Sequence, residues 1–313
     1  MTPPAAKTVD RRYDFVLLFD VADGNPNGDP DAGNLPRVDP QTMQGIVTDV
    51  CLKRKVRNAI AVMGEERPGA EIYFQTQDAI YERRVLNLQH QRAYDELGLA
   101  KNTKEKDDKS PKVKSDNTAK ARDWMCRTFY DIRAFGAVMT TGVNCGQVRG
   151  PVQLTFARSI DPIVPLEYAI TRKSVTTEED AKKQVDKDGS LTGTIGRKNN
   201  VPYGLYRCSG FVNPYLARQT GFTTADLEML FGALKGMIWE IDRSASRGLM
   251  STRGLYVFEH AGPLGNAPAH ELFDRVKVKA LGAEAAPRSF DQYQVTVDEA
   301  NLPEGVTLRR IVG

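Results

Sequence analysis

The sequence predicts an α+β fold built on one sheet with large insertions. Predicted helices and strands alternate, and β-rich segments concentrate in the C-terminal third, near residues 275–280, 290–297 and 306–312. Two charge-rich stretches, 101–120 and 171–198, contain few large apolar residues and cannot contribute a core. Together these features favour an α+β sheet with exposed excursions over a doubly wound parallel sheet.

Composition limits the classes of function. With 313 residues the chain can bury a substantial core, and 41% hydrophobic with 27% charged residues is ordinary for a soluble globular protein. The net charge is only +3, so binding of nucleic acid would depend on local patches. Four scattered cysteines and three histidines lack the spacing of a zinc site or a disulfide framework, so we expect no metal or cofactor. No apolar stretch suits a signal peptide or a membrane span, so we expect a cytoplasmic protein without a membrane partner.

The first fifth of the chain predicts a strand, a loop and a basic helix. Residues 1–12 suggest a disordered lead-in. The apolar run 13–21 predicts a strand covered on both faces, hence central in the sheet. Residues 23–31 are almost all Asn, Gly, Pro and Asp, which predicts a long surface loop. Asp39 as N-cap and Pro40 at the first helical position then predict a helix that runs to about residue 63.

Helical geometry gives this predicted helix a polar flank next to the loop. At ~100° per residue, the flank carries Gln41, Gln44, Thr48 and Lys55. Polar side chains beside the free N–H groups of a loop could follow a sugar-phosphate chain by hydrogen bonds and charge. The spacing alone fits an ordinary solvated helix face equally well.

Further elements follow in order. We expect a short strand over 71–77, a helix over 78–99, a mobile insertion over 101–120, and a helix over 118–135. The alternating segment 148–156 predicts a strand, with a bulge or edge position at Pro151. Residues 171–198 should project as a hairpin or flexible finger.

The remaining segments complete the predicted sheet. Residues 202–207 and 255–258 predict strands, and 242–248 predicts a polar loop with two arginines. Residues 224–241 predict a helix that begins at a Thr cap, with Glu228 nearby.

Six segments in this order resemble the repeated backbone subunit of type I-C Cascade, a CRISPR surveillance complex. They are Gly-Asn-Pro-Asn-Gly-Asp-Pro-Asp at 24–31, and the segments 37–57, 131–136, 148–153, 201–206 and 242–254. The resemblance implies an RRM-like (ferredoxin-like) palm over 13–63, 131–170 and 199–313. It also implies a helical fingers insertion over 64–130 and a protruding thumb over 171–198 that wedges into the guide RNA of the neighbouring subunit.

The resemblance implies a non-catalytic scaffold. Copies would polymerise along crRNA and hold its sugar-phosphate backbone for pairing with target DNA, in company with other Cascade subunits; sequence specificity would be delegated to base pairing. The predicted RNA-binding residues are Asn25, Asn27, Gly28, Arg37, Gln41, Gln44, Thr48, Lys55, Arg133, Arg197, Lys198, Arg243, Arg247 and Arg253.

Two alternatives use the aspartates of the first loop. Residues 23–31 match the start of an EF-hand calcium loop, but the twelfth position is Asn34 rather than Glu, and the loop follows a predicted strand. A metal-dependent ribonuclease, like the backbone subunits of type III complexes, could use Asp23, Asp29 or Asp31. Turn chemistry explains these aspartates better, and no histidine lies close in sequence to act as general base.

The segment 253–258 invites comparison with the RNP1 motif of ordinary RNA-recognition motifs. Leu255 stands where that motif has an aromatic residue, and Tyr256 where it has a small one. We therefore expect Tyr256 and Phe258 to be core residues, without base stacking on an open sheet face.

Overall fold

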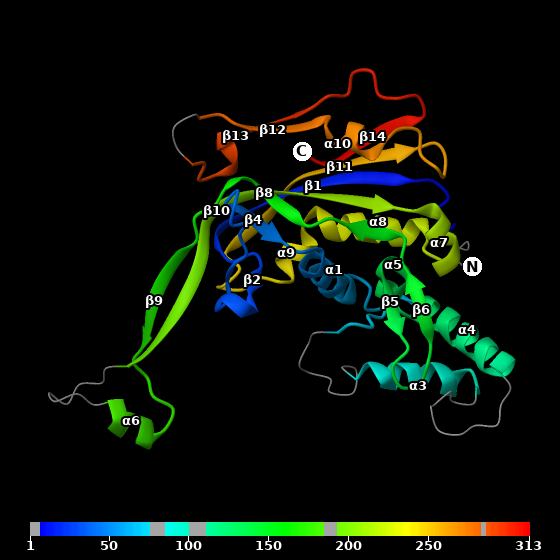
Figure 1. Cartoon of the computed structure of the whole chain (residues 1–313), viewed down its shortest axis with the longest axis horizontal. Coiled ribbons are helices and arrows are strands. Elements are labelled where there is room, and N and C mark those ends of the chain that lie inside the picture. Colours follow the sequence, from blue (N-terminus) through cyan, green and yellow to red (C-terminus); the bar gives the residue numbers. More distant parts are fainter. Residues whose placement is uncertain (1–6, 76–84, 100–110, 185–192, 283–285) are drawn as a thin grey trace.

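The computed structural model describes residues 7–75, 85–99, 111–184, 193–282 and 286–313 (Figure 1). Its centre is an antiparallel sheet with the strand order β14-β11-β1-β10-β8-β4, in which β7 and β9 also pair with β10. These strands are β1 (Tyr13–Gly24), β4 (Gln44–Val47), β7 (Val152–Leu154), β8 (Ala157–Pro162), β9 (Leu166–Arg172), β10 (Thr194–Val212), β11 (Leu249–His260) and β14 (Val306–Val312). The predicted combination of helices with one dominant sheet is confirmed.

Strand β1 lies between β10 and β11, as its apolar run predicts. Phe15, Leu17 and Phe19 point into the main core, whereas Val16 and Leu18 point into a second cluster on the opposite face. All five side chains are fully buried. The alternation explains why the run is apolar at nearly every position rather than at every second one.

Helices cover one face of the sheet and form the main core with it. They are α1 (Asp49–Met63), α7 (Pro214–Thr220), α8 (Thr224–Gly232), the π-helical segment η2 (Ala233–Met237) and α9 (Ile238–Glu240). The predicted helix over 224–241 is therefore present as three consecutive segments. Its N-cap is Thr223, and the capping box uses Asp226 rather than Glu228, because Asp226 is the third residue after the cap.

The opposite face carries a smaller layer. It consists of α10 (Ala269–Phe273), β12 (Val276–Ala280), η3 (Phe290–Gln292) and β13 (Tyr293–Val297), where β12 pairs with β13. The strands predicted in the C-terminal third are thus confirmed. Tyr256 and Phe258 pack into this layer and are 2% and 0% exposed, which confirms that they are core residues.

A helical lobe projects from the sheet and has a hydrophobic core of its own. It contains α3 (Leu86–Glu96), α4 (Pro111–Thr128), α5 (Tyr130–Phe135), β5 (Gly136–Met139) and β6 (Gly146–Arg149). Tyr94, Trp124 and Phe129 lie at its centre. No helix in the described ranges is long and apolar enough to cross a membrane.

Several predicted elements of these regions are wrong. Residues 111–120 belong to α4 and are not an irregular insertion, while 100–110 lie outside the described residues. The predicted strand over 71–77 is only an isolated bridge between Glu71 and Phe129 in its described part. The lead-in is ordered from residue 7, because Val9 is fully buried in the main core.

The predicted helix start at Asp39 is also wrong. Oδ1 of Asp39 accepts hydrogen bonds from the backbone N–H groups of Gln41 and Thr42, as an N-cap would, but these bonds close a turn. Strand β4 follows and pairs with β8. The helix α1 begins only after Thr48, whose Oγ1 accepts from the N–H of Cys51 at 3.3 Å. The β-branched run before that cap suits a strand better than a helix.

The predicted strand over 148–156 is divided at Gly150 and Pro151. β6 pairs with β5 in the helical lobe, whereas β7 pairs with β10 in the main sheet. Proline cannot donate to a sheet ladder, so the division falls where the sequence had placed a bulge or edge.

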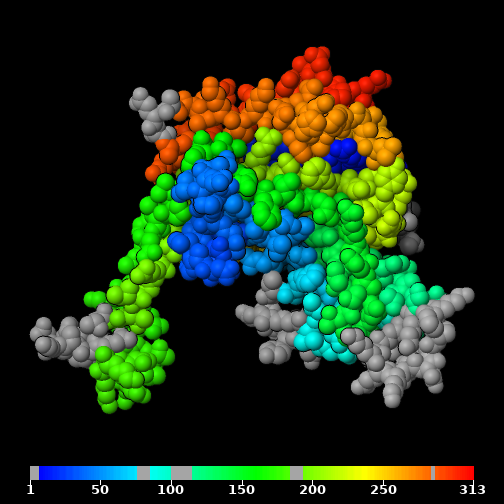
Figure 2. Space-filling view, in the orientation of Figure 1, coloured from blue at the N-terminus to red at the C-terminus, as the bar shows by residue number. Residues whose placement is uncertain are grey.

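A long hairpin projects from the other end of the sheet (Figure 1). Residues Leu166–Arg172 pair with residues 194–200 of β10, and the short helix α6 (Glu178–Gln184) lies near the tip. The predicted projecting hairpin is confirmed in its described part; 185–192 lie outside it. Figure 2 shows that the hairpin and the helical lobe project from the sheet in the same direction, with residues 24–36 between them.

Candidate nucleic-acid interface

The loop over residues 24–37 is closed by its own hydrogen bonds. It contains β2 (Gly28–Asp29), the 3₁₀ turn η1 (Pro30–Ala32) and β3 (Leu35–Pro36). Nδ2 of Asn25 donates a 2.7 Å hydrogen bond to the carbonyl of Asn34. Asn25 is 5% exposed, so the structure places this predicted RNA-binding side chain inside the loop rather than at its surface.

Asn27 connects the loop to the start of α1. Its Oδ1 accepts from both the N–H and the Oγ1 hydroxyl of Thr48, each at 3.0 Å. Gly28, the next residue, pairs with Pro36 in the small β2–β3 ladder. The structure therefore brings Asn27, Gly28 and Thr48 together, as the sequence predicts, although Thr48 is a helix cap and not part of a helix flank.

Arg37 is the cation of this loop. Its Nη1 lies 3.3 Å from Oδ2 of Asp29, and its backbone N–H donates to the carbonyl of Asn27. Nε of Arg37 has no hydrogen-bond partner among the described residues. The half-buried guanidinium thus has a buried donor that is unsatisfied.

Gln41 and Gln44 do not share a helix face. Gln41 is exposed in the turn after Asp39, while Gln44 lies in β4 and its Nε2 donates to the carbonyl of Ser159 at 2.9 Å. The predicted polar flank is therefore wrong as a helical surface. The strand that carries Gln44 is nevertheless joined to the end of the loop, because the N–H of Ile46 donates to the carbonyl of Arg37.

Lys55 is buried, contrary to its predicted place on the flank. It is 1% exposed, and its Nζ donates to Oδ2 of Asp242, which follows α9. Burial lowers the pKa of Lys55, and the carboxylate of Asp242 partly opposes that shift. Lys55 is therefore a structural contact between α1 and the 242–248 loop, not an exposed cation.

The 242–248 loop interlocks with the end of β1. The N–H of Asn25 donates to the carbonyl of Ser246 at 2.8 Å, and a Cβ on Gly24 would overlap the carbonyl of Arg247. Nε of Arg247 lies 3.5 Å from Asp242. Arg243 is exposed and forms a bidentate pair with Glu240. Arg247 thus lies beside the 24–37 loop, whereas Arg243 is at the surface of the 242–248 loop.

Arg253 lies on the other face of the sheet. Its Nε donates to Oδ2 of Asp20 at 2.8 Å, and its guanidinium lies 5.1 Å from the ring centroid of Phe290. The hydroxyl of Tyr203 donates to the same carboxylate oxygen. The structure therefore separates Arg253 from the 24–37 loop, although both were predicted to bind RNA.

Arg133 is an interior residue. Its Nε and Nη2 donate to the carboxylate of Asp226 at 3.0 and 2.9 Å, and Nη1 and Nη2 donate to the carbonyls of Cys126 and Gly69. At 8% exposure its guanidinium is fully engaged with protein. Its predicted placement at an RNA surface is wrong, because the side chain is buried. Local sequence could not show this, because the partner Asp226 lies 93 residues away.

Arg197 and Lys198 lie on the projecting hairpin. They pair across it with Ala169 and Tyr168, so Lys198 and Tyr168 share one face. Nη1 of Arg197 contacts Glu167 at 2.9 Å while its side chain stays 73% exposed. The face of Lys198 also carries Leu166 and Ile170, which are 41% and 50% exposed. The hairpin therefore presents apolar and cationic side chains together.

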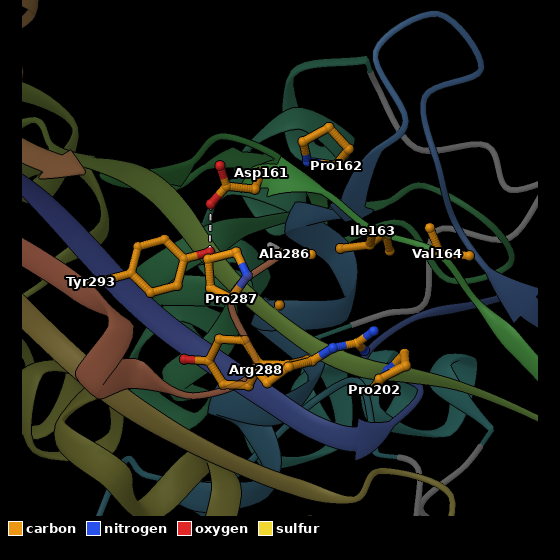
Figure 3. Close-up of a pocket in the computed structure, with 11 residues that line it drawn as sticks. Asp161, Pro162, Ile163, Val164, Pro202, Ala286, Pro287, Arg288 and Tyr293 are labelled. Atoms are coloured by element: carbon orange, nitrogen blue, oxygen red, sulfur yellow. Dashed lines mark hydrogen bonds between the residues drawn. The ribbon is translucent and has the colours of Figure 1, made fainter. Parts of the chain in front are cut away.

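A small cavity lies where the hairpin joins the sheet (Figure 3). The hydroxyl of Tyr293 donates to Oδ2 of Asp161 at 2.5 Å across it, and burial raises the pKa of Tyr293. Its volume of about 50 Å³ is far below the ~300 Å³ at which ligand pockets begin. We assign it a structural role.

The aspartates of the first loop take part in turn chemistry. Oδ1 of Asp29 accepts from the N–H of Asp31, and Asp23 adopts a left-handed backbone with φ 51°. In the described part of the chain, no three His, Cys, Asp or Glu side chains are arranged to hold a metal.

Sequence reasoning missed two residues that build the interface. Asp242 is the common partner of Lys55, Arg54 and Arg247, and Asn34 anchors Asn25. Asn34 could have been found from the sequence, because Asp-Ala-Gly before it predicts a turn and Asn tolerates a left-handed backbone. The structure shows that conformation, with φ 64° at Asn34. Asp242 could not, because it lies 187 residues from Lys55.

Comparison with known proteins indicates a family. The family model of CRISPR-associated protein Cas7 matches residues 11–298. A curated relative, CRISPR-associated protein Cas7 of Haloferax volcanii, is 25% identical over 235 residues, which cover 70% of this chain. The match spans 62% of that relative's length.

Two solved structures are similar at low identity. One is a CRISPR RNA-guided surveillance complex in a pre-nicking state, with 14% identity, TM-score 0.48 and coverage of 79% of this chain and 78% of the other. The second, a CRISPR RNA-guided surveillance complex, has 13% identity, TM-score 0.42 and coverage of 79% and 68%. Because the family model spans nearly the whole chain, the protein belongs to the CRISPR-associated protein Cas7 family.

Proposed function

We propose that this protein is the non-catalytic backbone subunit of a type I-C CRISPR surveillance complex. Copies of it polymerise along crRNA, hold the sugar-phosphate backbone for pairing with target DNA, and assemble with other Cascade subunits. In this proposal residues 13–63, 131–170 and 199–313 form the RRM-like palm, 64–130 the fingers, and 171–198 the thumb.

One observation carries the proposal: three segments that are far apart in sequence meet at one place. The 24–37 loop, the start of α1 and the 242–248 loop are joined through Asn27–Thr48 and Asn25–Ser246. Arg37 and Arg247 flank this junction, each within 3.5 Å of an aspartate, and their guanidinium groups could exchange that partner for a phosphate. Backbone amides and guanidinium groups side by side suit phosphate oxygens and do not read bases.

The set of RNA-binding residues that we propose is smaller than the set predicted from the sequence. We retain Asn27, Gly28, Arg37, Thr48 and Arg247 at the junction. Gln41 and Arg243, which are exposed, and the half-buried Gln44 lie around the junction, and the hairpin adds the exposed Arg197 and the half-buried Lys198. Asn25, Lys55 and Arg133 support the fold from within, and Arg253 lies on the opposite face.

Binding should depend strongly on salt and little on RNA sequence. Log affinity for a single strand falls with log salt at a slope near −0.7 per phosphate neutralised. Two unrelated RNAs of equal length, titrated at several salt concentrations, should give superimposable curves. A flat salt response, or a large difference between the two RNAs, would contradict the proposal.

Replacing Asp23, Asp29 and Asp31 together with Asn should leave bound RNA as intact as in the original protein, with or without Mg²⁺. The reason is that Asp29 is engaged with Arg37 and with the N–H of Asp31 and is not free to act as a base. Gel analysis of end-labelled RNA measures this. Cleavage by the original protein that the triple variant lacks would establish a ribonuclease instead.

A further inference from the structure

Phe156 is the one exposed phenylalanine of the chain. All 12 phenylalanines lie within the described residues, and the others are buried or half-buried. Phe156 itself is 53% exposed. Single exposed apolar residues are common in soluble proteins, so exposure alone gives the ring no role. The backbone that carries the ring and the groups beside it supply two further observations.

A β-bulge carries Phe156. Leu154 of β7 lies opposite Gly210 of β10, and Arg158 of β8 lies opposite Arg207 of the same strand. The three residues between Leu154 and Arg158 therefore face only two residues of β10. An extra residue of this kind interrupts the ladder and gives a side chain a new direction, and such bulges are frequent next to functional sites.

The bulge changes which side of the strand Phe156 takes. Buried and exposed residues alternate along a regular strand with one solvated face. Here Thr155 and Phe156 are both exposed, between the buried Leu154 and Ala157. The N–H of Thr155 donates to the carbonyl of Ser209 at 2.9 Å, so the strand stays attached to β10 at this point. The exposure of Phe156 is thus set by paired backbone.

The bulge also lies beside the junction of the 24–37 loop with the start of α1. Strands β4 and β8 are neighbours in the sheet (Figure 1), and Val47 pairs with Ala157. One residue further along this antiparallel register, Phe156 comes next to Thr48. Thr48 is the residue whose N–H and hydroxyl bind Oδ1 of Asn27. The exposed ring is therefore next to the proposed phosphate contacts.

An exposed ring beside phosphate-binding groups suits a nucleobase. Proteins that hold single strands without sequence preference combine backbone contacts with aromatic side chains on which bases stack, since every base has a π-face. The ring of Phe156 has no polar atom, so it cannot select a base by hydrogen bonds. We propose that Phe156 stacks on one base of the RNA strand whose phosphates lie at the junction. This inference rests on the proposed function and adds a base contact to it.

Phe156→Ala tests the contact. Binding of the shortest RNA that holds one copy should weaken by about 5- to 150-fold, the range for one base stacked on an aromatic side chain. Because no phosphate contact is lost, the slope of log affinity against log salt should not change. Tyr215→Ala is the matched control: Tyr215 is 42% exposed on α7, away from the junction, and its loss should not alter binding. Equal melting temperatures establish that both variants fold.

A strand of abasic nucleotides separates stacking from other uses of the ring. It keeps every phosphate, so the original protein and Phe156→Ala should bind it with equal affinity. Phe156→Trp adds a direct signal, because Trp124 and Trp239 are only 8% and 3% exposed and the indole at position 156 would be the exposed one. Ordinary RNA should quench its fluorescence, and the abasic strand should not.

Three results would overturn the stacking contact: unchanged RNA affinity in Phe156→Ala, an equal loss of affinity for the abasic strand, or no quenching in Phe156→Trp. Weaker cooperative coating of a long RNA with unchanged binding of one copy would assign the ring to a neighbouring copy, and would also overturn it. In each of these cases the original protein still binds RNA and the proposed function stands. If the original protein binds no RNA, the proposed function is wrong and the stacking contact is wrong with it.

Discussion

Asp242→Asn should destabilise the protein and loosen the junction of its two loops. Oδ2 of Asp242 accepts from Nζ of Lys55 and lies 3.5 Å from Arg247 and 3.7 Å from Arg54. Lys55 is 1% exposed, so its ammonium cannot turn to water when the carboxylate is lost. The Lys55 ammonium also lies 5.7 Å from the ring centroid of Trp239, which does not replace a carboxylate.

The expected loss in the free energy of unfolding depends on which charge remains buried without its partner. Removing one partner of a buried ion pair costs about 3–5 kcal/mol. Asp242 is 15% exposed and Asn still offers one acceptor, so we expect the lower end, about 3 kcal/mol. Lys55→Met should cost less, about 1–2 kcal/mol, because Arg54 and Arg247 remain beside the carboxylate. The double variant should be less destabilised than the sum of the two.

Urea unfolding of the four proteins measures these differences. Hydrogen exchange at the amide of Asn25, which donates to Ser246, reports the loop contact directly and should quicken in Asp242→Asn. Glu240→Gln is the control, because it breaks an exposed pair with Arg243 a few residues away. If Asp242→Asn shifts the unfolding midpoint no more than Glu240→Gln, or leaves exchange at Asn25 unchanged, the buried pair does not fix the loop.

Three other perturbations have defined outcomes. Gly24→Ala should cost about 3 kcal/mol in urea unfolding, because its Cβ would overlap the backbone of the facing loop, whereas Gly262→Ala, with open space around it, should be near neutral. Burial alone would raise the pKa of Asp226, but hydrogen bonds from Arg133 hold it below its usual value. This stabilisation is complete above pH ~4 and is lost as the pH falls through the folded pKa, so Asp226→Asn should flatten stability against pH in that acid range. Replacing residues 174–198 with a short Gly-Ser linker should leave the melting temperature nearly unchanged, because the hairpin is exposed, yet abolish cooperative coating of RNA; unchanged coating would reduce the hairpin to a solvated loop.

Local patterns were sufficient for the elements whose signal is local. The apolar run of β1, the alternating strands of the C-terminal third and the charge-rich hairpin each carry their structure in consecutive residues. The start of α1 was misplaced because Asp39 makes the same two hydrogen bonds in a turn that it would make as a cap. Only pairing of β4 with β8, more than a hundred residues later, distinguishes the two.

The candidate site was predicted in part for the same reason. Asn27, Gly28 and Thr48 are near one another in sequence, and the structure brings them together. Lys55 and Arg133 looked like surface cations because their acidic partners lie 187 and 93 residues away. A single sequence contains no signal for such distant pairs, and a lysine on a helix is usually solvated.

The interlocking of Gly24 with the 242–248 loop has a thermodynamic consequence for any ligand. Fixing a flexible backbone costs about 1–2 kcal/mol per residue. Here the 24–37 loop is held by Asn25, Asn27 and the facing loop before a ligand arrives. That entropy is lost during folding and not again on binding, so affinity does not depend on ordering the loop. The same rigidity prevents the loop from remoulding itself, and a strand of the wrong curvature should be rejected by shape alone.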